Sequence, residues 1–105
     1  MVLYIMRWDI LPDKMEAYLK WSEGAIRRTV AAPGVVEFRA YRTAASPPGQ
    51  VVVTYEFKNM VAWAEWHSQE DVRKVQDELS TLTTNWTAEL WGPSPVVPEP
   101  IRPGK

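Results

Sequence analysis

The order in which two hydrophobic periodicities alternate along the chain restricts its fold more than any other feature. Residues 2–9, 35–42, 50–57 and 84–91 are rich in β-branched and aromatic residues and read as strands. Apolar residues recur every three or four positions from Met15 to Val30, which predicts a helix between the first two strands. Helical spacing returns from Met60 to Leu79, with Ser68 as a cap between two helical pieces. The order strand, helix, strand, strand, helix, strand predicts an α+β fold, a ferredoxin-like split βαββαβ sandwich on a four-stranded antiparallel sheet.

Handedness places both crossover helices on one face of this sheet, which leaves the other face open in a single chain. Alternation assigns polar residues to the open face in all four strands: Arg7, Asp9, Glu37, Arg39, Thr54, Glu56, Thr87 and Glu89. Because valines, tyrosines and tryptophans are interleaved with these charges, we expect the open face to pair with a second copy of the chain. In that homodimer Arg39 is predicted to pair with Glu37, and Arg7 with Glu56 or Glu89.

The length and the distribution of proline define one domain and a tail. With 105 residues, 46% of them apolar, one core is expected over residues 1–92. Residues 93–105 hold five of the nine prolines and predict an extended tail. We expect this tail to wrap the partner subunit through Val96, Val97 and Ile101, with disorder as the alternative. The polar loop 43–49, between the two middle strands, predicts a mobile hairpin tip.

Charge and residue usage exclude several classes of partner. A formal net charge of -1 gives no reason to expect nucleic acid or an anionic membrane as partner. Without cysteine there is no disulfide framework or thiolate nucleophile, and a reducing cytoplasm fits. The apolar run from Met1 to Met6 is too short for an export signal or a membrane span. No phosphate loop, nucleotide fingerprint or metal-spaced cluster is present, so a small neutral ligand or another protein remains.

Two segments resemble the antibiotic-biosynthesis-monooxygenase-like branch of the dimeric α/β-barrel superfamily. They are APGVVEFRAYR, after the first helix, and YEFKNMVAWAEWHSQEDV, and the resemblance covers about residues 2–91. It implies a homodimer whose two sheets close into a barrel, with a small-molecule cavity between each sheet and its own helices. Members of the oxygenase branch work without a cofactor, removing a proton from a phenolic or anthrone-type substrate that then reacts with dioxygen. No cofactor is therefore expected.

Asn59, Trp63 and His67 are the predicted catalytic residues. Asn59 and Trp63 reproduce the spacing Asn-x-x-x-Trp with which one oxygenase group of the family contacts its substrate. The structural alternative is that Asn59 caps the helix and Trp63 fills the core. His67, the only histidine, can deprotonate a phenol, or it is a packed residue near the helix break. It is not expected to bind a metal without a second nitrogen or sulfur ligand.

Tryptophan is frequent, with six in the chain, and serves either as interface anchor or as pocket wall. Trp66, Trp86 and Tyr55 are predicted to contact a flat aromatic ligand.

The haem-degrading pattern of the superfamily is disfavoured, since the first strand lacks asparagine and no histidine follows Trp63 or Trp66 by ten residues. The last strand also lacks the arginine that the Asn-x-x-x-Trp group uses.

Three functions remain open after these observations. The first is a cofactor-independent monooxygenase-like protein that acts on a small aromatic or quinol-type molecule. The second is a non-enzymatic dimeric barrel, an accessory or stress-response module, whose pocket binds a hydrophobic ligand without a perturbed titratable group. The third is a muconolactone-type isomerase, which needs a carboxylate such as Glu56 or Glu65 inside the cavity. Whether the chain is an enzyme, and on which substrate, is not decided by the sequence.

Overall fold

The computed structural model describes residues 1–43 and 50–104 and has the predicted order of elements. Strand β1 spans Val2–Ile10, and helix α1 spans Met15–Ala31 after a single 3-10 turn, η1, at Pro12–Lys14. The remaining elements are β2 (Val35–Arg42), β3 (Gln50–Phe57), α2 (Met60–His67), α3 (Glu70–Ser80) and β4 (Thr83–Trp91). The predicted mobile tip between β2 and β3 lies outside the described residues, apart from Thr43 at its start.

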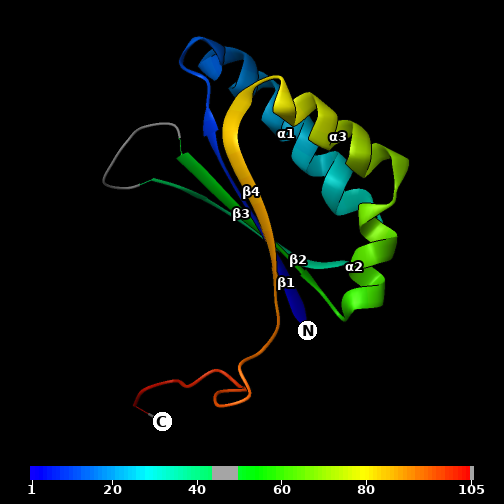
Figure 1. Cartoon of the computed structure of the whole chain (residues 1–105), viewed down its shortest axis with the longest axis vertical. Helices are drawn as coiled ribbons and strands as arrows, with labels where there is room; N and C mark the ends of the chain where they lie inside the picture. The colour runs from blue at the N-terminus through cyan, green and yellow to red at the C-terminus, as the bar shows by residue number, and fades with distance from the viewer. Residues whose placement is uncertain (44–49, 105) are drawn as a thin grey trace.

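The four strands form one antiparallel sheet in the order β2-β3-β1-β4. Figure 1 shows all three α-helices on the same side of this sheet, which confirms the predicted ferredoxin-like α+β architecture with one covered face. None of the described helices has both the length and the apolar character that crossing a membrane requires.

Alternation along the two central strands builds the core. From Tyr4 onward, the inward residues of β1 and β3 are buried: Tyr4, Met6, Trp8, Ile10, Val51, Val53, Tyr55 and Phe57. Trp66 of α2 and Val72 of α3 close over them and are 1% and 0% exposed. Burial of side chains this large stabilises the fold by about 1.5–3 kcal/mol each.

The break in the second helical segment is at Ser68 and Gln69. Ser68 ends α2: its backbone N–H donates to the Ala64 carbonyl and its hydroxyl donates to the Glu65 carbonyl, while the N–H of Gln69 donates to the Trp66 carbonyl. Gln69, in an extended conformation, then precedes α3. The predicted cap therefore belongs to the end of α2, because the serine hydroxyl donates back to a carbonyl of that helix instead of accepting from α3.

Gly34 allows the turn from α1 into β2 to pass close beneath α2. Its φ is 115°, and a Cβ there would lie 3.4 Å from the Ala62 carbonyl oxygen and 3.7 Å from Cβ of Trp66. Since other residues rarely adopt this conformation, glycine is required at this position. A side chain at this position would contact Trp66 of α2 and Phe57 of β3.

The open face of the sheet carries the residues that alternation assigned to it. Leu3, Ile5 and Val52 are half-buried there, and Arg39 donates to Glu37, as predicted. Among the described residues Arg7 forms no ion pair within the chain.

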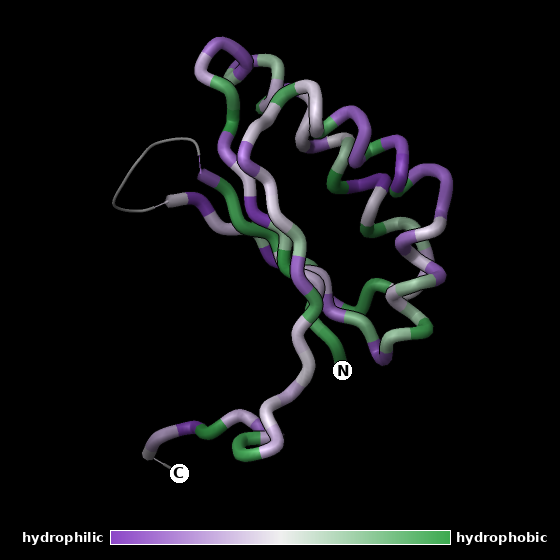
Figure 2. Tube along the Cα trace, viewed as in Figure 1, coloured by the Kyte–Doolittle hydropathy of each residue, from purple (hydrophilic) through white to green (hydrophobic). Residues whose placement is uncertain are grey.

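After Trp91 the described residues include no further helix or strand, and the segment leads away from the domain (Figure 1). Figure 2 shows hydrophobic positions recurring along it.

Candidate functional site

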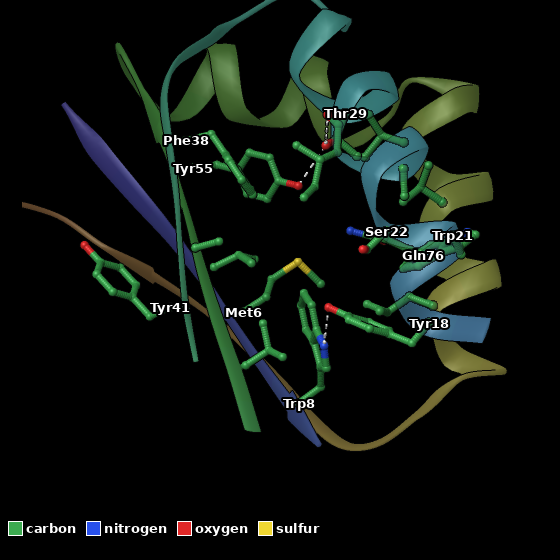
Figure 3. A pocket seen from close by; sticks show the side chains of 18 of the residues that line it. Met6, Trp8, Tyr18, Trp21, Ser22, Thr29, Phe38, Tyr41, Tyr55 and Gln76 are labelled. Atoms are coloured by element: carbon green, nitrogen blue, oxygen red, sulfur yellow. Dashed lines mark hydrogen bonds between the residues drawn. The ribbon is translucent and has the colours of Figure 1, made fainter. Parts of the chain in front are cut away.

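A cavity of about 180 Å³ lies between the covered face of the sheet and helices α1 and α3. Met6 and Trp8 of β1 and Tyr55 of β3 form its floor, and Tyr18 and Thr29 of α1 face them (Figure 3). Other lining residues are mainly apolar: Trp21, Ala25, Phe38, Val51, Val53, Trp66, Val72, Val75 and Leu79. Leu19 and Ile26 of α1 are exposed lining residues and mark the mouth, near Arg42 of β2. The cavity thus suits a flat apolar molecule.

Thr29 joins three elements around one end of this cavity. The Tyr55 hydroxyl donates to Thr29 Oγ1 over 2.9 Å, and Thr29 Oγ1 donates to the Ile26 carbonyl over 3.0 Å. The Trp66 indole N–H donates to the Thr29 carbonyl oxygen over 2.9 Å. These bonds hold α1 against β3 and α2, so the aromatic wall formed by Tyr55 and Trp66 has a defined orientation.

A second set of bonds positions the other end. The Trp8 indole N–H donates to the Tyr18 hydroxyl oxygen over 3.2 Å. Trp21 and Arg28 of α1 both donate to Glu78 of α3, each over 2.8 Å. The Glu78 carboxylate thereby links the two helices that cover the cavity, and the arginine beside it lowers the pKa of that carboxyl.

The tyrosine hydroxyls of the cavity stay protonated at neutral pH. Burial raises the pKa of Tyr55 to about 12 and raises the pKa of Tyr18 as well. A phenol that remains neutral can donate a hydrogen bond but does not act as a base. Tyr41 is also near the cavity, but its side chain points to the opposite side of the sheet in Figure 3.

The three residues predicted to be catalytic lie outside the cavity lining, at the neighbouring helix α2. Asn59 is exposed and precedes α2, and its Oδ1 accepts the Ala62 N–H over 2.9 Å. Trp63 is partly buried and packs on Tyr4, with ring centroids 5.6 Å apart. The capping and packing roles considered from the sequence are therefore present, and the catalytic role stays a prediction.

His67 stacks on Trp63 with ring centroids 5.0 Å apart. Its imidazole also meets the edge of Tyr4, at 5.9 Å between centroids. Burial lowers the pKa of His67, and the nearby Arg73 adds to this effect. The imidazole is therefore neutral at pH 7 and has a lone pair that can accept a proton. The indole nitrogen of Trp63 is buried and has no hydrogen-bond partner among the described residues.

The structure separates the three residues predicted to bind a ligand. Tyr55 and Trp66 line the cavity, whereas Trp86 does not and is 44% exposed on the edge strand β4. A bulge near Asn85, where φ is 55°, interrupts the register of β4 with β1 just before Trp86. The sequence did not predict this bulge. Asparagine is among the residues that adopt a positive φ most often, but its presence in a strand does not by itself indicate that it does so.

Several cavity residues were not singled out from the sequence. Tyr18, Ser22 and Thr29 are polar members of the apolar stripe of α1, and Gln76 is a polar member of the stripe of α3. A polar residue at an inward helical position is the signal that would have found them. In the described part of the chain no group of three or more His, Asp or Glu side chains is placed to hold a metal ion.

The fold and the cavity define the class of protein: an α+β ferredoxin-like domain with an aromatic-lined cavity beneath its helices. The sequence model of the antibiotic biosynthesis monooxygenase (ABM) family matches residues 1–78, so the chain belongs to that family. No functionally curated protein matches the chain significantly in sequence.

Solved structures with the same fold share little sequence with this chain. Rv0793 from Mycobacterium tuberculosis is 20% identical with a TM-score of 0.75, over 89% of this chain and 94% of its own. A structure described as an antibiotic biosynthesis monooxygenase is 17% identical with a TM-score of 0.77, over 90% of this chain and 100% of its own. An asparagine-to-alanine variant of SnoaB, a cofactor-independent oxygenase from Streptomyces nogalater, is 17% identical with a TM-score of 0.73, over 93% and 97%. At these identities the likeness establishes the fold alone.

Proposed function

We propose that this protein is a cofactor-independent monooxygenase-like enzyme that binds a small aromatic or quinol-type molecule in the cavity beneath its helices. The observation that carries the proposal is a mainly apolar, aromatic-walled cavity in a chain of the ABM family. SnoaB, with the same fold, is described as a cofactor-independent oxygenase.

The size of the cavity suggests the size of the ligand. An engineered protein cavity of about 150 Å³ accommodates benzene. The cavity here, about 180 Å³, has room for one aromatic ring, or for two fused rings when part of the ligand extends toward the mouth near Arg42. Phe38, Tyr55 and Trp66 supply the flat walls against which such a ring packs.

The chemistry proposed needs a proton acceptor and exclusion of water. Oxidation of an activated ring CH₂ group to a carbonyl consumes one O₂ and releases one water, so the electrons balance without a cofactor. The neutral His67 imidazole is the proposed acceptor for the substrate proton. The protonated Tyr18 hydroxyl, which accepts from Trp8 and keeps its own O–H, is the proposed donor to negative oxygen. Access from the cavity to His67 requires Trp66 or Trp63 to move, since both rings lie next to the imidazole.

The same geometry supports a second candidate, a binding protein without chemistry. This candidate was expected to have no perturbed titratable group in its pocket, whereas burial raises the pKa of both Tyr18 and Tyr55. The shifts keep both phenols neutral, so neither of these cavity tyrosines is a base at neutral pH. An isomerase has less support, because Glu56 lies on the open face of the sheet and Glu65 is exposed on α2. Neither carboxylate lines the cavity.

We also propose that the open sheet face pairs with a second copy. Half-buried Leu3, Ile5 and Val52 and the 55% exposed Trp91 give it apolar area, and its charges are of both signs, which suits self-pairing. The exposed Val96 and Ile101 of the tail are proposed to contact that copy. The cytoplasmic location predicted from the sequence stays a prediction.

Dioxygen uptake by metal-stripped protein, measured against naphthols, hydroquinones and anthrones, tests the proposed function. Ala25→Leu should lower the uptake at least about ten-fold, because the larger side chain fills the cavity beneath α1. Ala17→Leu is the matched control, since Ala17 is on the exposed side of the same helix and its variant should retain full uptake.

Uptake no faster than the protein-free rate would refute the oxygenase for these substrates. Calorimetric titration of the same compounds then decides whether the binding protein stands: binding that Ala25→Leu abolishes would support it, and absence of binding would reject it.

A further inference from the structure

The side-chain amide of Gln76 has a donor that forms no hydrogen bond within the described part of the fold. It lies on α3 among Val72, Val75 and Leu79, the apolar side of the helix that packs toward the sheet. Its amide nitrogen Nε2 is buried and has no hydrogen-bond partner among the described residues. A buried donor that is left unpaired has lost its hydration without compensation, so it destabilises the ligand-free protein.

The other polar side chains inside the cavity already have partners within the fold. The bonds run from Tyr55 to Thr29, from Thr29 to the Ile26 carbonyl, from Trp8 to Tyr18 and from Ser22 to the Leu19 carbonyl. Figure 3 shows Gln76 beside Ser22 on the helical side of the cavity, opposite Met6 and Trp8. Tyr18 only accepts in its bond with Trp8, so its O–H and the Gln76 amide are the donors that remain available to a ligand. Of the two groups, the amide nitrogen is the one without any hydrogen-bond partner among the described residues.

Tyr4 is the neighbour that competes for this amide. The Gln76 amide lies close enough to the Tyr4 hydroxyl to oppose the rise in the pKa of Tyr4 that burial causes. Its nitrogen nevertheless makes no bond of acceptable geometry with that hydroxyl. Gln76 lines the cavity and Tyr4 does not, so of these two residues Gln76 is the one that a ligand in the cavity contacts.

We infer that Gln76 is a specificity-determining residue whose Nε2 donates a hydrogen bond to a neutral carbonyl oxygen of an aromatic ligand in the cavity. This inference rests on the proposed function, because it takes the cavity as the ligand site. A carbonyl suits the site better than a carboxylate, since the one cationic side chain among the lining residues, Arg42, is exposed at the mouth. An aromatic ketone or quinone is the ligand class that satisfies both the apolar walls and the unpaired donor.

A matched pair of ligands and an isosteric variant test the inference. Tetralin and 1-tetralone have nearly the same shape and differ by one carbonyl oxygen. Their dissociation constants are measured by calorimetric titration for the wild type and for Gln76→Met, which keeps the volume and removes the donor. The ratio of ketone to hydrocarbon affinity should fall about ten-fold in Gln76→Met, which corresponds to about 1.4 kcal/mol. The Tyr4→Phe variant should keep the wild-type ratio.

Two readouts separate a ligand contact from a structural role. In the wild type, the side-chain amide resonance of Gln76 should shift when 1-tetralone binds and remain in place with tetralin. Without ligand, Gln76→Met should melt about 5 °C higher than the wild type, because the unpaired donor is gone. A residue with a merely structural role would lower the melting temperature when replaced.

The outcomes distinguish this inference from the proposed function. An unchanged affinity ratio in Gln76→Met, or an equal loss in Tyr4→Phe, would overturn the role of Gln76 while the cavity still binds ligand. If neither compound binds the wild type, the cavity is not the ligand site, and both the proposed function and this inference fail. Ketone-selective binding without dioxygen uptake would support the inference and reject the oxygenase.

Discussion

Replacement of Tyr55 by phenylalanine should change the stability of the protein in opposite directions at pH 8 and at high pH. Tyr55 is 6% exposed and donates to Thr29 Oγ1 over 2.9 Å. At pH 8 the variant loses one buried hydrogen bond, which costs about 1 kcal/mol. Thr29 keeps its own bond to the Ile26 carbonyl, so no donor is left unpaired.

The ionisation of Tyr55 reverses this difference as the pH rises. Burial raises the pKa of the folded-state phenol from 10.0 to about 12, so the folded protein favours the neutral form. The stability that this group contributes is complete below pH 10 and is lost as the pH rises through the folded-state pKa. The loss in the wild type is about 1.4 kcal/mol at pH 11 and approaches about 2.7 kcal/mol well above pH 12. The Phe variant escapes that loss, so it should equal or exceed the wild type in stability at pH 11 and above.

Urea unfolding at pH 8 and pH 11, followed by tryptophan fluorescence, measures both differences. Tyr4 and Tyr18 also have raised pKa values, but they are present in both proteins and cancel in the comparison. Tyr41→Phe is the matched control, because it removes a hydroxyl from a side chain that is 51% exposed. A wild-type advantage that is the same at both pH values would show that Tyr55 is not held neutral by burial.

Two further predictions concern α2 and the tail. Asn59→Ala should lower the free energy of unfolding by about 1 kcal/mol through loss of the bond to the Ala62 N–H, measured by urea unfolding. If Asn59 is also catalytic, this variant abolishes dioxygen uptake at a temperature where it is fully folded; uptake at the wild-type rate would leave Asn59 as a cap only. Truncation after Trp91 should lower the melting temperature and make it fall more steeply on dilution, because Val96 and Ile101 no longer cover the partner. An unchanged melting curve across protein concentrations would count against a tail that wraps the second subunit.

The family resemblance placed a cavity between the sheet and its helices, and the structure has one there, but the side chains that meet around it could not be predicted from the sequence. Each strand reveals its own inward face, so Tyr55 was available as a candidate before its partners were known. Thr29 is 26 residues from Tyr55, and no local pattern signals that the two hydroxyls meet. The Asn-x-x-x-Trp spacing drew attention to α2, but Asn59 is exposed and Trp63 packs on Tyr4 outside the cavity.

Local physics accounts for what the sequence alone determined. The period of apolar residues distinguishes strands from helices, and the handed crossover connection then places α1, α2 and α3 on one side of the sheet. The periodicity also gave the bounds of β2 and β3, 35–42 and 50–57, as the structure has them. Tertiary structure decided which inward side chains leave a space between them, that Trp66 closes it, and that Gln76 faces it with an unpaired amide. Such a space depends on how side chains from distant segments pack together, and a periodic pattern specifies the direction of a side chain without specifying what it meets.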